Sequence, residues 1–165
     1  MNKAILSVFL VLLLSCNPRT EATNGNSTSP KELNLTPDFG IALKFVNDYA
    51  GYCAPNDQKR DERTWIEKNP LLTTNFKNIY KNILDSALKK DPELGLDFDP
   101  IFDAQDFPDK GFSIIGADTS SGYVTVVGND WKEFKLVLKV VTDDNKWLVD
   151  GAGIINVPTG KRAAR

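Results

Sequence analysis

The spacing of the apolar residues changes halfway along this 165-residue chain, and the change restricts the folds that the chain can adopt. From about residue 39 to residue 88, apolar side chains recur every three or four positions, which is the period of an amphipathic α-helix. After residue 111 they come in short β-branched and aromatic runs separated by turn-forming residues. Helices followed by consecutive strands predict an α+β domain, with N-terminal helices packed on one face of a curved four-stranded antiparallel sheet.

Two apolar stripes define the main predicted helices. The first helix begins after a capping segment at residues 36–38 and cannot extend far past Pro55. The second is capped by Thr73 or Thr74 and ends before Pro92. The two stripes consist of Phe39, Ala42, Leu43, Val46, Tyr49, Ala50 and Cys53, and of Leu72, Phe76, Ile79, Tyr80, Ile83, Leu84, Ala87 and Leu88.

A short helix at residues 60–69 is expected between these two, with Trp65 and Ile66 turned inward. Beyond the helices, Gly151 and Gly153 lie in a strand-like run, where glycine more often marks a bulge than a phosphate-binding loop. In the third run apolar residues alternate in part with lysines, which indicates a face that is at least partly wetted. The four predicted strands are residues 112–118, 122–129, 134–142 and 146–157.

The first sixteen residues have the pattern of a secretory signal. Lys3 precedes an apolar run at residues 4–14, which is shorter than the roughly 20 residues that a membrane-spanning helix needs. The run ends in Leu-Leu-Ser-Cys, which resembles the bacterial lipobox, a signal in which the cysteine is lipidated and becomes the first residue of the mature protein. We therefore predict a lipoprotein signal peptide at residues 1–15, a lipid anchor on Cys16 and a location in the bacterial cell envelope, facing the periplasm or in the outer membrane.

The rest of the chain divides into a tether, one domain and a tail. Residues 16–37 are rich in Asn, Thr, Ser and Pro and nearly free of apolar side chains, which predicts a flexible tether. Residues 38–158 are long enough for a single α+β domain with one core. The basic tail at residues 159–165 is interpreted as a solvated end rather than a membrane-surface contact.

The composition excludes several kinds of chemistry. The chain contains no histidine, which rules out a Ser–His–Asp arrangement, and once Cys16 is acylated Cys53 is the only remaining thiol. We interpret Cys53 as a small buried apolar residue, and we expect no metal and no cofactor. The formal net charge of −2 gives no indication of a nucleic-acid partner.

Residues 97–111, DFDPIFDAQDFPDKG, combine five aspartates with three phenylalanines and two prolines. A calcium loop of the EF-hand kind is disfavoured because no glycine lies in mid-loop and no glutamate closes it. Asp103 and Asp106 would share a face on a helical turn and are the alternative catalytic pair of a carboxylate-dependent hydrolase. We favour a structural interpretation, a short helical turn capped by Asp99, with Phe102 and Phe107 turned inward and with structural roles for Asp99, Gln105, Asp106 and Pro108.

The order of helices, this aspartate-rich segment and strands ending in Asn-Lys-Trp-Leu-Val-Asp resembles an uncharacterised bacterial family, domain of unknown function 3828. The resemblance spans about residues 38–155, and the Gln-Asp-Phe-Pro step at residues 105–108 is its most specific part. Members of that family are largely secreted or lipid-anchored, and their build is similar to that of the nuclear-transport-factor-2-like and cystatin-like folds, in which helices are wrapped by a bent sheet. The resemblance implies a fold and no activity.

We therefore expect a binding or interaction module rather than an enzyme. Its expected partner is a protein or a small ligand, and its lipid anchor would attach it to the membrane. Aromatic side chains suit such contacts. Trp131 is the strongest candidate, because a Trp in the polar turn at residues 129–132 has no evident packing role. The other binding candidates are Tyr49, Tyr52, Trp65, Phe112 and Trp147.

Overall fold

The computed structural model describes residues 36–55 and 60–164. The predicted signal peptide, Cys16 and nearly all of the predicted tether lie outside the described residues. Within them, no helix is both long enough and apolar enough to cross a membrane.

The three helices form close to where the apolar stripes place them. Helix α1 (Gly40–Cys53) follows Asp38, whose carboxylate accepts a bond from the Gly40 N–H, and helix α2 (Glu62–Lys68) is capped by the Asp61 side chain. Helix α3 (Thr74–Lys90) is capped by Thr73, whose Oγ1 accepts from the Phe76 N–H at 3.0 Å. Each helix thus begins at a short polar side chain that satisfies an otherwise unbonded N–H group.

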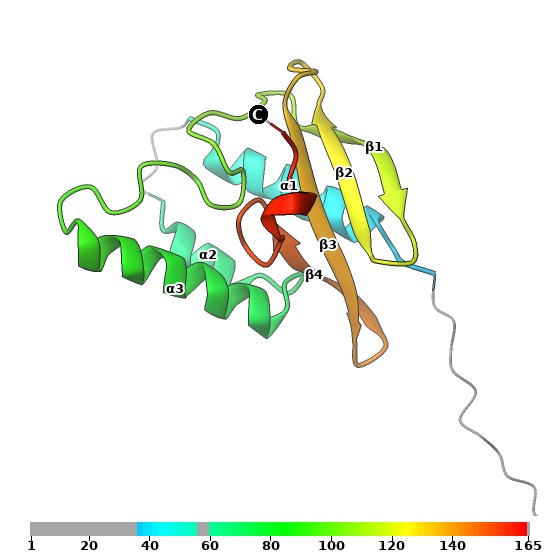
Figure 1. The fold of residues 1–165 in the computed structure, drawn as a ribbon, viewed down its shortest axis with the longest axis horizontal. Helices are drawn as coiled ribbons and strands as arrows, with labels where there is room; N and C mark the ends of the chain where they lie inside the picture. The colour runs from blue at the N-terminus through cyan, green and yellow to red at the C-terminus, as the bar shows by residue number, and fades with distance from the viewer. Residues whose placement is uncertain (1–35, 56–59, 165) are drawn as a thin grey trace, which may run out of the picture. The chain divides into compact units, whose positions relative to one another are not determined.

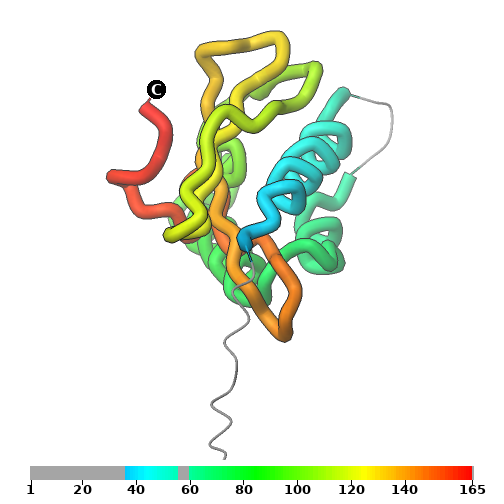
Figure 2. The backbone as a smooth tube through the Cα atoms, turned by 90° about the vertical axis from the view of Figure 1, so that its right-hand side faces the viewer, coloured from blue at the N-terminus to red at the C-terminus, as the bar shows by residue number. Residues whose placement is uncertain are grey.

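The four predicted strands form one antiparallel sheet in the order β1-β2-β3-β4. The strands are β1 (Phe112–Asp118), β2 (Tyr123–Gly128), β3 (Lys135–Asp143) and β4 (Lys146–Ala152). Helix α1 lies along one face of this sheet, while α2 and α3 lie beside one another at its edge (Figure 1, Figure 2). The α+β architecture of helices before a four-stranded antiparallel meander is therefore confirmed.

The core lies between α1 and the inner face of the sheet. It contains a series of aromatic rings, each in contact with the next. Such large, flat side chains fill the space between a helix and a curved sheet and bury much apolar surface. Phe45, absent from the predicted stripe, is fully buried at its centre. The largest fully buried side chains include Tyr49, Phe45, Phe76, Phe102, Ile66 and Ile101.

A bulge in β4 carries a buried aspartate that joins the sheet to α3. The register shifts between Lys139–Gly151 and Val140–Val149, so Asp150 is the extra residue. Its carboxylate accepts bonds from Thr73 Oγ1 (2.8 Å), Asn75 Nδ2 (3.2 Å), Asn156 Nδ2 (2.6 Å) and Lys139 Nζ (3.4 Å). The sequence predicted the bulge but not this role of Asp150, which holds the first turn of α3 against the end of the sheet.

The C-terminal segment covers part of the outer face of the sheet, opposite α1 (Figure 2). Arg162 Nε donates to the Val157 carbonyl at 2.9 Å, and Lys161 Nζ lies 5.6 Å from the centre of the Tyr123 ring. Thr159, Gly160 and Lys161 are exposed, in keeping with the solvated end expected for this segment. Arg162 departs from that expectation, because it is partly buried and its guanidinium donates to the carbonyls of Val157 and Ile154.

Candidate functional site

The aspartate-rich segment at residues 97–111 contains a hydrogen-bonded turn at residues 100–103, which Asp99 caps and which does not continue into a helix. Asp99 Oδ1 accepts bonds from the N–H groups of Ile101 (2.7 Å) and Phe102 (3.0 Å), as predicted for a cap. The Asp99 N–H donates to the Ala104 carbonyl at 2.9 Å, which brings the chain back on itself before any helix can form. Because Ile101 and Phe102 are fully buried, the turn is fixed to the core.

This turn forms one wall of a cavity of about 590 Å³, which we call the α2–α3 cavity. The other walls come from the end of α1, the start of α2 and the second half of α3. The cavity is of the size that small-molecule sites usually have. Its lining includes Cys53, Glu62, Arg63, Tyr80, Leu84, Leu88, Leu94, Leu96, Asp97, Asp99, Gln105 and Phe107.

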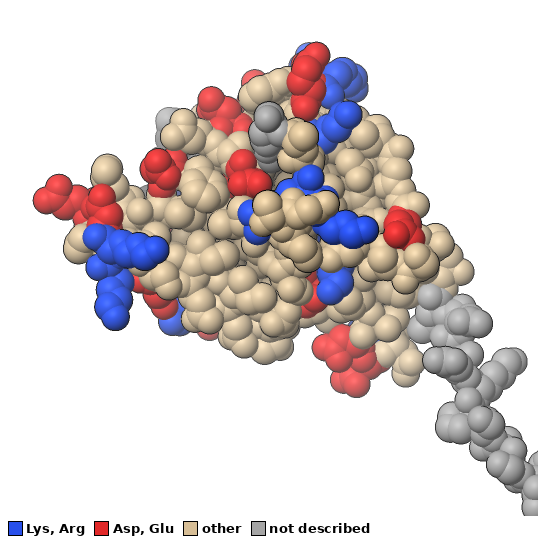
Figure 3. Space-filling view, viewed as in Figure 1, with Lys and Arg blue, Asp and Glu red and all other residues tan. Residues whose placement is uncertain are grey.

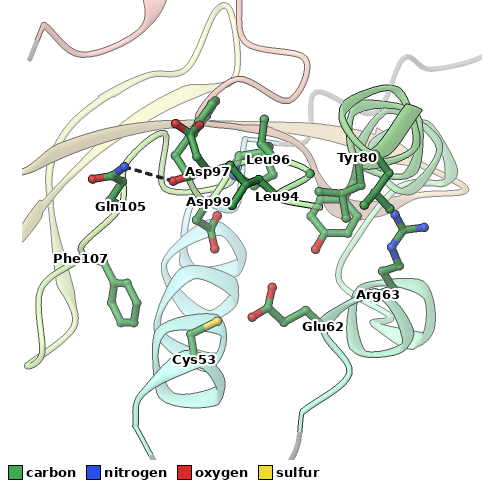
Figure 4. A pocket seen from close by; sticks show the side chains of 15 residues that line it. Cys53, Glu62, Arg63, Tyr80, Leu94, Leu96, Asp97, Asp99, Gln105 and Phe107 are labelled. Atoms are coloured by element: carbon green, nitrogen blue, oxygen red, sulfur yellow. Dashed lines mark hydrogen bonds between the residues drawn. The ribbon is translucent and has the colours of Figure 1, made fainter. Parts of the chain in front are cut away.

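Polar groups from the three helices and from the aspartate-rich turn point into this cavity. Figure 4 shows the Glu62 carboxylate, the Cys53 thiol, the Asp99 carboxylate and the Tyr80 hydroxyl directed toward the same space. Gln105 lies at the side, where its Nε2 donates to the Asp97 carbonyl at 3.2 Å (Figure 4). The structural contact of Gln105 thus lies within the loop itself.

Asp99 is the most constrained of these groups. Besides its two backbone bonds, its Oδ2 accepts a 2.6 Å bond from the hydroxyl of Tyr49, a fully buried residue of α1. Burial raises the pKa of the Asp99 carboxyl above its ordinary value, although the Tyr49 hydroxyl and the two N–H groups oppose that rise. Asp99 thus carries a sheltered charge at the inner end of the cavity.

Glu62 lies at the mouth of the cavity and is an exposed residue. The walls nevertheless displace enough water from its carboxyl to raise its pKa, and the nearby charge of Asp99 raises it further. The only basic lining residue of the described chain, Arg63, is directed toward α3, where its Nη1 lies 2.7 Å from Asp85 Oδ1.

Neither the thiol nor the phenol in the cavity is activated as a nucleophile. Burial raises the pKa of the Cys53 thiol to about 12, so it stays protonated near neutral pH. Burial likewise raises the pKa of the Tyr80 hydroxyl, and the charges of Glu62 and Asp99 add to the rise. The arrangement is suited to binding through carboxylates and apolar contacts rather than to covalent catalysis.

The opposite wall of the cavity is apolar and partly open to water. Leu88 at the end of α3 is 46% exposed, and Leu94 in the following turn is 76% exposed. Leu88 belongs to the predicted inward stripe, but α3 extends past the sheet, so its last turns have little to pack against (Figure 1). These leucines leave an apolar surface beside the acidic groups.

Asp103 and Asp106, the alternative catalytic pair, are not among the lining residues of the α2–α3 cavity. Asp103 is partly buried with a backbone φ of 55°, and Asp106 is exposed on the surface. The positive φ of Asp103 takes the backbone out of the right-handed helical region, so Asp103 and Asp106 do not share a helical face. The cavity carboxylates are instead Glu62, Asp97 and Asp99.

Two of the six predicted aromatic contacts are core residues. Tyr49 is fully buried and Phe112 is 3% exposed, so neither ring faces a partner at the surface. Both rings stack within the core, with centroids 5.2 Å and 5.9 Å from that of Phe102. Their place in the amphipathic patterns is explained by packing alone.

Tyr52 and Trp65 are partly buried and lie together, with ring centroids 5.2 Å apart. They line a second, more open hollow beside α2. Trp147 is also partly buried but packs against the core from β4, away from this pair. Tyr49 also lies beside Trp65, with ring centroids 5.5 Å apart, so the structure brings together three of the predicted aromatic residues.

Trp131 is 42% exposed, in keeping with the surface position expected for it. One edge of its ring packs on Phe134, with centroids 5.2 Å apart. The turn that carries it is held by Asn129, whose Nδ2 donates to the Lys110 carbonyl at 2.8 Å, and by Asp130, which accepts from the Lys110 N–H. Trp131 is thus presented at a rigid corner of the domain.

The face shown in Figure 3 carries acidic and basic side chains interspersed with uncharged surface.

Sequence reasoning did not single out Glu62, Tyr80, Leu94 or Leu96 as site residues. The cavity forms only when α2, α3 and the aspartate-rich turn come together, and no local pattern marks that meeting. One signal was available: Leu94 and Leu96 are isolated apolar residues in the otherwise polar run DPELGLD. In the described part of the chain, no group of three or more His, Cys, Asp or Glu side chains is arranged to hold a metal ion.

Comparison with known proteins found no matching family model, no matching curated protein and no matching solved structure.

Proposed function

We propose that this protein is a lipid-anchored binding protein of the bacterial cell envelope, and that it holds a small ligand in the α2–α3 cavity without transforming it. The proposal for its location depends on the signal-like N-terminus and the Cys16 lipobox. The resemblance to domain of unknown function 3828, with its nuclear-transport-factor-2-like build, belongs to the same proposal.

One observation carries the binding role. The cavity combines an apolar wall, formed by Leu88 and Leu94 among others, with a few convergent polar groups, and this combination is typical of small-ligand sites. Two further observations favour binding over catalysis. The Cys53 thiol stays protonated near neutral pH, and the Asp99 carboxylate already accepts three hydrogen bonds.

Native mass spectrometry of the full chain, purified from the envelope of its own host, tests this role. We expect a bound small molecule with the wild-type chain and its loss from the Leu88→Ser/Leu94→Ser variant, which removes two exposed apolar side chains from the cavity wall. Ile115→Ser is the matched control, because Ile115 is an exposed apolar residue on β1, outside the cavity. Absence of any bound molecule, or its equal loss from the control, would contradict the proposal.

A second candidate function is a protein contact centred on Trp131. The specific observation in its favour is the exposed ring on a turn fixed by Asn129 and Asp130. A rigid aromatic residue with a polar rim is the usual centre of a protein interface.

A further inference from the structure

The charges in the α2–α3 cavity are not balanced. Three carboxylates, Glu62, Asp97 and Asp99, line it, against Arg63 as the single basic lining residue of the described chain. The Arg63 guanidinium is engaged by Asp85, which lies outside the cavity. The charge of Arg60 reaches the Glu62 carboxyl and offsets part of this excess, but an occupant still meets more carboxylates than cations.

The carboxylates differ in how far they are already engaged. Asp99 accepts three hydrogen bonds and serves as a fixed charge. The Glu62 carboxylate has neither an ion-pair nor a hydrogen-bond partner in the described part of the chain, and Figure 4 shows it directed into the cavity. A ligand cation placed between them would donate to Glu62 and be attracted by Asp99.

Apolar side chains adjoin these carboxylates. Leu84 and Leu88 from α3 face Leu94 and Leu96 from the following turn, and Phe107 lies on the other side. A hydrated metal ion would gain nothing from such walls, whereas an organic group would remove them from water. The cavity volume of about 590 Å³ leaves room for an organic group beyond the charged atom.

We propose that the α2–α3 cavity selects an organic cation, namely a primary or secondary ammonium carried on an apolar body. The ammonium binds at the Glu62 carboxylate near Asp99, and the apolar body lies against Leu88 and Leu94. This inference rests on the proposed binding function and names the chemical class of its ligand. An anionic ligand of the same shape is repelled by the same two carboxylates.

The affinity for such a cation depends on pH in a defined direction. The groups that face Glu62 are Asp99 from the turn, Cys53 from α1, Tyr80 from α3, and Arg60 and Arg63 near α2. Cys53 and Tyr80 stay neutral near neutral pH, so the charge that faces the ligand changes at Glu62 and Asp99 as the pH falls. Both carboxyls have raised pKa values, so they take up protons at a higher pH than an ordinary carboxyl does. Cation binding should therefore begin to weaken at that higher pH.

Three probes of matched shape test the proposal: 4-phenylbutylammonium, 4-phenylbutanol and 4-phenylbutanoate. Their binding to the full chain in lipid nanodiscs is measured by titration calorimetry, with empty nanodiscs as the blank. We expect the ammonium to bind more tightly than the alcohol and the carboxylate to bind most weakly. Glu62→Gln should lower the affinity for the ammonium roughly tenfold, because a charged hydrogen bond is lost. The affinity for the alcohol should hardly change, because the cavity keeps its shape.

Glu67→Gln is the matched control, because Glu67 lies on the same helix and is absent from the cavity lining. It removes the same charge from the protein and should leave all three affinities as they are. Equal effects of the two substitutions would overturn the proposal, since they would show a response to net charge alone.

The outcomes also separate the ligand class from the binding function. If all three probes bind equally, or if the alcohol or carboxylate binds best, the inference about a cation fails. If in that case Leu88→Ser/Leu94→Ser still lowers the affinity for all three probes, the cavity remains supported as a binding site. If none of the probes binds, or if that double variant changes nothing, the inference fails together with the assignment of the site to this cavity.

Discussion

The hydroxyl of Tyr49 donates a 2.6 Å hydrogen bond to Asp99 Oδ2, which ties the buried face of α1 to the turn that walls the cavity. The two residues are 50 positions apart in the chain. Two backbone N–H groups hold the other oxygen of Asp99, so the carboxylate is fixed in place. Core and candidate site are therefore joined at one carboxylate.

Tyr49→Phe should destabilise the protein by roughly 1–3 kcal/mol, because Asp99 Oδ2 loses its donor in a place that water reaches poorly. The free energy of unfolding from urea titration measures the effect. Tyr123→Phe is the control: it removes the same hydroxyl from a ring that lies beneath Lys161 on the outer face. A loss no larger than that of the control would show that the bond contributes little.

The cost of Tyr49→Phe should shrink as the pH falls. Burial raises the pKa of Asp99 in the folded protein, and the Tyr49 hydroxyl lowers it, so removing that hydroxyl raises the pKa further. A raised carboxyl pKa means that the folded state gains protons more readily than the unfolded state, so acidification relieves the penalty of the variant. The difference in unfolding free energy between variant and wild type should thus be smaller at about pH 4.5 than at about pH 7. A constant or growing difference would contradict the assigned role of Asp99.

Asp150→Ala should cost roughly 2–4 kcal/mol, because it removes the common acceptor of Thr73, Asn75, Lys139 and Asn156. Urea titration again measures it, and hydrogen exchange should show the largest loss of protection in the first turn of α3. Asp143→Ala, at the exposed end of β3, is the control and should change stability by no more than about 0.5 kcal/mol.

Trp131→Ala separates a surface contact from a packing role. The ring is 42% exposed but packs partly on Phe134, so we expect a loss of roughly 1 kcal/mol in stability. If Trp131 anchors a protein partner, that partner should be lost from pull-downs of solubilised envelopes, since truncating such an anchor costs roughly 2 kcal/mol or more of binding. Persistence of the partner with the variant would remove this surface from consideration.

Metabolic labelling with a palmitate analogue tests the anchor. Wild-type protein should be labelled in a bacterial host and should fractionate with membranes, whereas Cys16→Ala should do neither. Cys53→Ala is the control for labelling at the other cysteine and should keep the label. Equal labelling of wild type and Cys16→Ala would refute the lipid anchor.

Local patterns were sufficient for the elements of the fold. Stripes with a period of three to four residues predict α1 and α3, and of the two possible caps, Thr73 and Thr74, the structure uses Thr73. The predicted cap at Asp99 also forms, and the turn after it closes within five residues at the Asp99–Ala104 bridge. That bridge depends on Ile101 and Phe102 being drawn into a core that only later strands complete.

The candidate site was much less predictable. Tyr49 and Phe112 fit either a core or a binding site in the sequence, because aromatic residues serve both, and burial alone distinguishes the two uses. Glu62 was overlooked because an acidic residue in the first turn of a helix is ordinary in itself. Its position becomes informative only beside Asp99, which follows it by 37 positions.

The order and type of the helices and strands follow from local sequence, since hydrophobic period, capping residues and turn residues act within a few positions of one another. The same sequence contains no histidine and therefore offers no imidazole for catalysis. Folding alone leaves Leu88 exposed, places Glu62 and Asp99 in one cavity and buries Asp150 among four donors. Burial and electrostatic interaction depend on which distant segments meet, and a one-dimensional pattern does not contain that information.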